Sequence, residues 1–124
     1  DISNYEEGIN AWKCGVDIVG TTMSGYTDYT SKKDEPDYEL MERLAKDTDI
    51  PVIGEGKIHY PDQAVKALQT GVWAIVVGGV RWKSHRDFRR QLKQVNKMRT
   101  KKDVSELHIL FCYSKCSILW NGYK

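Results

Sequence analysis

The sequence has no long apolar stretch, since its longest apolar runs fall far short of the roughly 20 residues that a membrane-spanning helix needs. It also lacks a charged N-terminal segment followed by an apolar one, which is the pattern of a secretion signal. A length of 124 residues, of which 40% are hydrophobic and 29% charged, suits one soluble globular domain and is too short for two. We therefore expect a cytoplasmic protein without a membrane partner.

Cysteine is scarce, with only Cys14, Cys112 and Cys116. An odd number of cysteines in a chain without an export signal predicts reduced thiols. His108, Cys112 and Cys116 are spaced to share one helical face, but three ligands are a weak signal and we expect no metal site. The chain starts at Asp1 rather than at methionine, so we expect either a processed protein or a part of a longer one.

Basic residues are concentrated in one segment. Residues 81–102 hold ten of the nineteen Lys and Arg residues and one acidic residue, Asp87. Such a segment can bind nucleic acid. The expected helix over residues 84–97, however, carries apolar residues at helical spacing, which favours a docked helix with a solvated basic face. We therefore expect no nucleic-acid partner. The apolar residues are Phe88, Leu92, Val95 and Met98.

Short apolar segments alternate with amphipathic ones along most of the chain. Apolar strands separated by helices are typical of a parallel sheet with helices packed on it. We expect both faces of that sheet to be buried. The segment from residue 107 to 113 is apolar and aromatic but lacks the glycines of the earlier units, and the pattern gives it no place. The expected helices cover residues 4–13, 36–45, 61–70 and 84–97, and the expected strands cover residues 16–22, 50–55 and 73–77.

Small or polar residues follow each expected strand. Ligands of α/β proteins bind at the carboxyl ends of the strands, so these clusters indicate a binding site. The loop over residues 23–36 is long for a compact domain and is typical of a functional segment. The clusters are Gly20-Thr21-Thr22, Glu55-Gly56 and Gly78-Gly79.

Glu55 is the strongest candidate for chemistry, because a carboxylate at the end of a buried strand is costly unless something uses it. It could act as a general acid or base, or it could cap a loop or pair with Lys57. The Gly78-Gly79 pair could hold a phosphate with its main-chain N–H groups, or it could form a tight turn. Gly56, one strand away, favours the phosphate interpretation.

Taken together, five motifs resemble the C-terminal half of the N-acetylmannosamine-6-phosphate 2-epimerase family. The Gly-Thr-Thr-x-Ser-Gly-Tyr-Thr block is the most specific of them. The likeness extends over residues 1–79 and less clearly to residue 98. The motifs are Asp1-Ile2-Ser3, Val19 to Thr27, Glu35-Pro36-Asp37, Val52 to Ile58, and Trp73 to Gly79.

The resemblance implies a fold and an activity. The fold would be part of a TIM (β/α)8 barrel, comprising the last three β/α units and the end of the fifth strand. Residues 1–100 would form this part, and residues 101–124 would be a divergent tail. The activity would interconvert N-acetylmannosamine 6-phosphate and N-acetylglucosamine 6-phosphate in sialic acid degradation, and a homodimer is one assembly that the full-length parent could form.

The resemblance also implies residue roles. Glu55 would remove or return the proton on the carbon that bears the acylamino group, without a metal or other cofactor, and Asp1 would help to organise the catalytic site. The remaining matched positions would bind the sugar phosphate. These positions are Gly56, Gly78, Gly79, Lys83, Lys57 and Thr21.

Several positions depart from the family pattern. Lys83 and Lys57 stand where arginine is usual, so the charge is kept but the bidentate fork is lost. Gly54 stands where alanine is common, and the family's catalytic lysine, on an early strand, has no counterpart here. We therefore expect the chain alone to show negligible turnover. Two other interpretations stay open: another phosphate-binding barrel enzyme, such as a synthase or aldolase, and a non-catalytic phosphate-ligand or basic interaction domain.

Overall fold

The computed structural model describes residues 1–32, 34–78, 90, 91, 94 and 109–111. Three helices and four strands follow one another in the described part of the chain. In chain order these are α1 (Tyr5–Lys13), β1 (Val19–Gly20), α2 (Tyr38–Asp47), β2 (Val52–Gly54), α3 (Pro61–Gln69), β3 (Ala74–Val77) and β4 (Ile109–Phe111).

The helices begin where the sequence predicts. The Asn4 side chain accepts a hydrogen bond from the main-chain N–H of Glu7, and the Asp37 side chain accepts one from that of Leu40. These caps satisfy N–H groups that have no partner within the helix. The helix α3 starts instead with Pro61, whose missing N–H costs nothing at that position.

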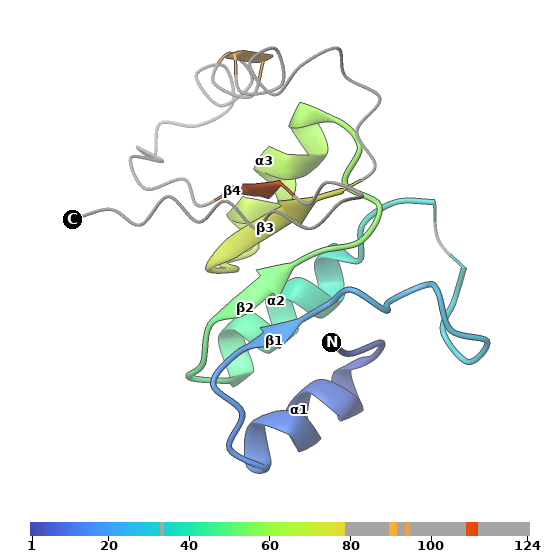
Figure 1. Cartoon of the computed structure of the whole chain (residues 1–124), viewed down its shortest axis with the longest axis vertical. Helices are drawn as coiled ribbons and strands as arrows, with labels where there is room; N and C mark the ends of the chain where they lie inside the picture. The colour runs from blue at the N-terminus through green and yellow to red at the C-terminus, as the bar shows by residue number, and fades with distance from the viewer. Residues whose placement is uncertain (33, 79–89, 92–93, 95–108, 112–124) are drawn as a thin grey trace.

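The strands form one sheet in the order β1-β2-β3-β4, and every neighbouring pair is parallel. The parallel sheet predicted from the sequence is therefore confirmed, although the strands are shorter than expected. The helix α2 packs against β2 and α3 against β3, while α1 packs on α2 (Figure 1). None of the described helices is both long and apolar enough to cross a membrane.

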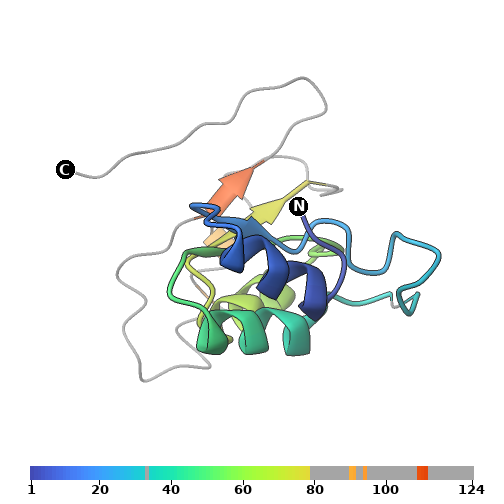
Figure 2. The same cartoon turned by 90° about the horizontal axis from the view of Figure 1, so that it is seen from below.

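The three helices lie on the same side of the sheet (Figure 2). We call this side the helix-covered face and the opposite side the open face. Side chains of a strand alternate between the two faces. On the opposite face Ile53 and Ala74 are buried as well, as expected for a parallel sheet. The hydrophobic core cluster lies on the helix-covered face. Its strand residues are Val19, Val52, Ile75 and Val77, which pack with Leu40, Met41, Leu44, Ala64, Val65 and Ala67.

The strand residues that alternate with those of the core point to the open face. Gly20 lies beside Ile53 in the sheet, and Ile53 lies beside Ala74. Continuing two residues beyond Gly20 and Ile53 brings Thr22 and Glu55 to this same face at the carboxyl ends of the strands. Alternation along the paired strands therefore places the core and these two side chains on opposite faces.

Residues 1–3 run alongside the outer edge of β1. The Ile2 N–H donates to the Gly20 carbonyl over 2.8 Å, and the Met23 N–H donates to the Ile2 carbonyl over 3.1 Å. These bonds bring Asp1 next to the end of β1. The site therefore draws residues from four neighbouring segments of chain.

The strand β4 pairs with β3 through Ile75–Ile109, Val76–Leu110 and Val77–Phe111. The sequence pattern assigns no element to residues 107–113, and three of them form a parallel strand at the edge of the sheet. The basic segment lies outside the described residues except for Arg90, Gln91 and Gln94, which are helical. His108, Cys112 and Cys116 also lie outside them.

Candidate functional site

A hollow of about 430 Å³ opens at the carboxyl ends of β1, β2 and β3. Parallel strands present their carboxyl ends at the same edge of a sheet, which is why segments distant in sequence meet there. The lining residues are Thr22, Met23, Tyr26, Glu55, Gly56, Lys57, Ile58, His59, Val76 and Gly78.

Thr21 holds the main chain of Glu55 from behind. Its hydroxyl donates to the Glu55 carbonyl over 2.9 Å and accepts from the Glu55 N–H over 3.0 Å. Thr21 is fully buried, so water cannot replace these bonds. This pair of bonds fixes the point at which the glutamate leaves β2.

Thr22 contacts the Glu55 side chain on the open face. Its hydroxyl oxygen lies 3.0 Å from Glu55 Oε2 and 2.8 Å from Asp1 Oδ1. Gly20 leaves room for this group, because a Cβ at that position would lie 3.3 Å from Asp1 Oδ1 and 3.4 Å from Thr22 Oγ1. The two carboxylates are thus joined through one threonine hydroxyl.

The chain turns sharply after Glu55. Gly56 has a φ of 103° and Lys57 a φ of 59°, both in the left-handed region. A residue other than glycine adopts this region only when its surroundings hold it there. The Lys57 ammonium lies 3.5 Å from the Gly25 carbonyl oxygen and 5.1 Å from the centre of the Tyr26 ring. The loop after β1 therefore holds Lys57 at the side of the hollow.

Groups that are chemically suited to an anion come from two strand ends. Gly56 and Gly78 line the hollow, and Lys57 adds a positive charge beside them. Gly79 and Lys83 lie outside the described residues. Within the described ranges, no group of three or more His, Cys, Asp or Glu side chains is arranged to hold a metal ion.

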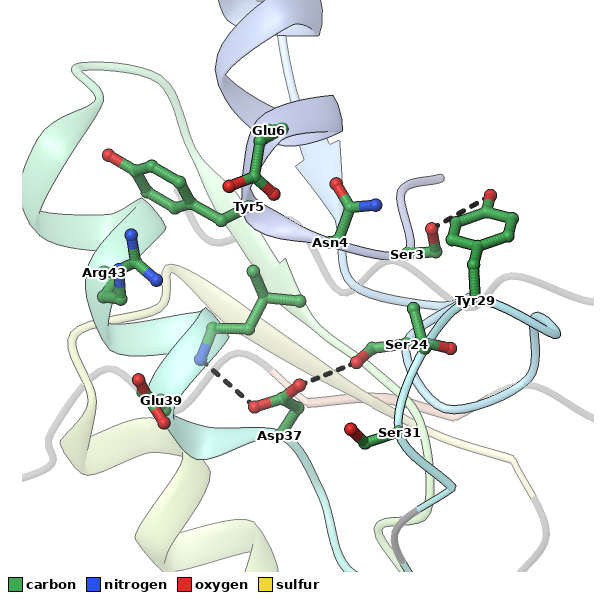
Figure 3. Close-up of a pocket in the computed structure, with 12 residues that line it drawn as sticks. Ser3, Asn4, Tyr5, Glu6, Ser24, Tyr29, Ser31, Asp37, Glu39 and Arg43 are labelled. Carbon is green, nitrogen blue, oxygen red and sulfur yellow. Dashed lines mark hydrogen bonds between the residues drawn. The ribbon is translucent and has the colours of Figure 1, made fainter.

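A second hollow, of about 280 Å³, lies between the N-terminal ends of α1 and α2 and the loop after β1 (Figure 3). Its polar groups bond largely to one another. The Ser3 hydroxyl and the Tyr29 hydroxyl both donate to the Glu7 carboxylate, over 2.7 and 2.9 Å, and the Ser24 hydroxyl donates to Asp37 over 2.8 Å. These hydrogen bonds hold the loop against the N-terminal ends of the two helices.

The surroundings of Glu7 and Tyr38 shift the pKa values of these side chains. Hydrogen bonds from the main-chain N–H and hydroxyl of Ser3, and from the Tyr29 hydroxyl, hold the pKa of Glu7 below its usual value. Burial, followed by the negative charges of Glu35 and Asp62, raises the pKa of Tyr38 to about 12. Both groups lie among structural contacts rather than in the hollow that holds Glu55.

Comparison with known proteins identifies the family. The family described as "Putative N-acetylmannosamine-6-phosphate epimerase" matches residues 1–97. The chain belongs to this family. The prediction drawn from the sequence motifs is therefore confirmed.

Individual relatives of this epimerase family agree. Proteins named "Putative N-acetylmannosamine-6-phosphate 2-epimerase" are 52% identical over 90 residues in Caldanaerobacter subterraneus and 55% identical over 78 residues in Clostridioides difficile. These alignments cover 73% and 63% of this chain, but only 38% and 35% of the relatives. The chain thus spans well under half of their length.

A solved structure shows the same fold in this region. It is that of the N-acetylmannosamine-6-phosphate 2-epimerase from Clostridium perfringens, with a TM-score of 0.62 and 43% sequence identity. The match covers 79% of this chain and 40% of that one. The α/β arrangement with a parallel sheet is therefore shared with a member of the family.

The structure brings most of the predicted site residues together. Gly56, Lys57, Gly78 and Glu55 line one hollow, and Asp1 reaches its edge through Thr22. Thr21 lies behind Glu55, with its hydroxyl bonded to the main chain of that residue, and a direct contact with substrate stays a prediction.

Six residues that line the hollow had no role assigned from the sequence, although Thr22 stood in a cluster that indicated a binding site. They are Thr22, Met23, Tyr26, Ile58, His59 and Val76. Thr22 could have been found, because alternation along β1 puts it on the face opposite Thr21. Met23 and Tyr26 lie in a loop, which has no such period.

Proposed function

We propose that this chain supplies the Glu55 side of the active site of an N-acetylmannosamine-6-phosphate 2-epimerase. The observation that carries the proposal is the position of Glu55. Its carboxylate lines the hollow at the strand ends, with Oε2 3.0 Å from the Thr22 hydroxyl oxygen, and its main chain is held by Thr21. A general base needs such a fixed position within reach of the proton that it takes.

The reaction inverts the carbon that bears the acylamino group of a hexosamine 6-phosphate. The Glu55 carboxylate takes or returns the proton on that carbon, next to the substrate carbonyl. When the C–H bond breaks, its electron pair moves onto the carbonyl oxygen, and that oxyanion needs stabilisation. A second acid–base group must act on the opposite face of the carbon. The resemblance assigns that role to a lysine that this chain does not contain.

The phosphate binds beside Glu55. The main chain at Gly56 and Gly78 and the Lys57 ammonium support this assignment, because glycine lets an anion approach main-chain N–H groups closely. Gly79 and Lys83 would extend the same site. Asp1 acts at its edge, where its carboxylate lies 2.8 Å from the Thr22 hydroxyl.

The same proposal includes the architecture. The strands β1, β2 and β3 would be the last three strands of a TIM barrel, with residues 1–3 as the end of the fifth. Three observations support it: the strands are parallel, residues 1–3 form main-chain hydrogen bonds beside β1, and the described helices lie on a single face. A sugar phosphate as the small-molecule partner and a cytoplasmic location belong to this proposal.

The test is to complete the barrel and change Glu55→Gln. We expect turnover to fall by at least about 100-fold, because the amide cannot accept the proton. The matched control is Glu42→Gln, at an exposed position on α2, which should leave turnover unchanged. Exchange of the substrate proton with solvent, followed by NMR, measures the step directly.

Two results would contradict the proposal. Turnover of Glu55→Gln within a few-fold of the parent would remove Glu55 from the reaction. Robust turnover by the 124-residue chain alone would show that no second half is needed.

A further inference from the structure

Thr22 presents one hydroxyl to two carboxylates. Its oxygen lies 2.8 Å from Asp1 Oδ1 and 3.0 Å from Glu55 Oε2, both within hydrogen-bond distance. A threonine hydroxyl has one hydrogen to donate, and an ionised carboxylate can only accept. With both carboxylates ionised, the three oxygens share one hydrogen, and one of the two contacts sets a lone pair against a negative oxygen.

A proton on Glu55 removes this conflict. The Glu55 carboxyl then donates to the Thr22 hydroxyl, and Thr22 donates to Asp1. Three oxygens now share two hydrogens, and both short contacts become hydrogen bonds, the second of them to a charged acceptor. The geometry is therefore better suited to protonated Glu55 than to ionised Glu55.

We propose that Thr22 is a positioning residue that stabilises the protonated form of Glu55 by linking it to Asp1. This inference rests on the proposed function, because protonated Glu55 is the state that forms when the glutamate has taken the proton of the substrate carbon. Interactions that strengthen as the proton moves lower the barrier, whereas interactions equal in both states do not. Asp1 stays ionised and accepts from Thr22 throughout, so no further proton is needed.

The neighbouring threonine provides the contrast. Thr21 is fully buried, and its hydroxyl bonds the main chain of Glu55, whose hydrogen count does not change during the reaction. Thr22 is half-buried and bonds the side chain. The two adjacent hydroxyls thus divide the work between fixing Glu55 and responding to its protonation.

The first test uses the 124-residue chain and needs no turnover. In Glu55→Gln the amide Nε2 can donate to Thr22, as a protonated glutamate would. We expect this change to raise the thermal unfolding midpoint by roughly 3–6 °C at neutral pH. In a Thr22→Val background the same change should raise the midpoint by less than about 1 °C, while in a Thr22→Ser background the full gain should return.

Comparing Glu55→Gln in these backgrounds separates the effect of the hydrogen bonds through Thr22 from the effect of removing the Glu55 charge. Removing the Glu55 charge relieves its repulsion with Asp1 whether or not Thr22 has a hydroxyl. A gain that survives Thr22→Val, or the absence of any gain in the parent background, would overturn the inference. Glu42→Gln serves as the control for an amide at an exposed position.

The second test measures kinetics in the completed barrel. Thr22→Val should lower kcat by about tenfold or more and leave KM within twofold, and Thr22→Ser should restore most of kcat. If Thr22→Val keeps kcat while Glu55→Gln abolishes it, the inference fails and the proposed function stands. If Glu55→Gln keeps kcat, the proposed function fails. The comparison of thermal unfolding midpoints still tests whether Thr22 links Glu55 to Asp1.

Discussion

The two faces of one sheet do different work in this protein. On the helix-covered face, Val19, Val52 and Ile75 are almost completely buried against α2 and α3. On the open face, Thr22 and Glu55 are half-buried and bonded to each other. Consecutive residues of one strand thus face the core and the hollow in turn, so a shift of the strand register by one residue would disturb both.

The comparison also separates two kinds of threonine bond. Thr21 and Thr22 are neighbours in sequence, yet only Thr21 is enclosed by protein. A buried hydroxyl is costly to remove because its partners are left without hydrogen bonds, whereas a hydroxyl near solvent is replaced by water. Stability should therefore depend on Thr21 and catalysis on Thr22.

The largest expected effect on stability lies on the helix-covered face. Leu44 is fully buried, and a Cβ added at Gly8 would lie only 2.6 Å from its Cδ2 atom, so α1 and α2 pack closely there. We expect Leu44→Ala to lower the free energy of unfolding by about 2–5 kcal/mol, measured by urea denaturation. Glu42→Ala, on the exposed side of the same helix, should stay within about 0.5 kcal/mol. A loss below about 1 kcal/mol for Leu44→Ala would show that this face does not hold the fold together.

An intermediate effect is expected at the boundary between the faces. Thr21→Val keeps the shape of the side chain but leaves the N–H and carbonyl of Glu55 without their partner. The free energy of unfolding should fall by about 1–3 kcal/mol. Thr22→Val should cost less than half as much in the same urea experiment. Equal losses at the two positions would contradict the division between them.

The smallest effect on the free energy of unfolding is expected for substitutions of two glycines, one facing the site and one facing the core. A Cβ at Gly20 would press on Asp1 and Thr22, whereas one at Gly54 would meet Met41, with its Sδ 3.1 Å away. Both Gly20→Ala and Gly54→Ala should change the free energy of unfolding by no more than about 1 kcal/mol, because the nearest atoms belong to side chains that can move.

The turnover of the completed barrel should distinguish the two glycine substitutions. In the completed barrel, Gly20→Ala should lower turnover roughly tenfold by displacing the carboxylates, and Gly54→Ala should leave it unchanged. The same loss of turnover in both variants would mean that the two faces are not independent.

Much of the fold could be predicted from the sequence. Asn4, Asp37 and Pro61 mark helix starts through local chemistry, and helical spacing identified the buried side of α2. The strand β4 escaped prediction because three residues carry no usable period, and only pairing with β3 makes them a strand. The motif at Glu55 was recognised because glycine and a carboxylate after an apolar strand are a local signal.

The family, the helix starts and the parallel sheet could be derived from the sequence alone, which also predicts Glu55 as the centre of the site. Each of these depends on residues close together in the chain. The folded chain was needed to show that the Thr22 hydroxyl contacts both Asp1 and Glu55, that the Thr21 hydroxyl bonds the main chain of Glu55, and that β4 extends the sheet. These contacts join residues 20 or more positions apart, and their distances depend on how parallel strands align, which no local pattern encodes.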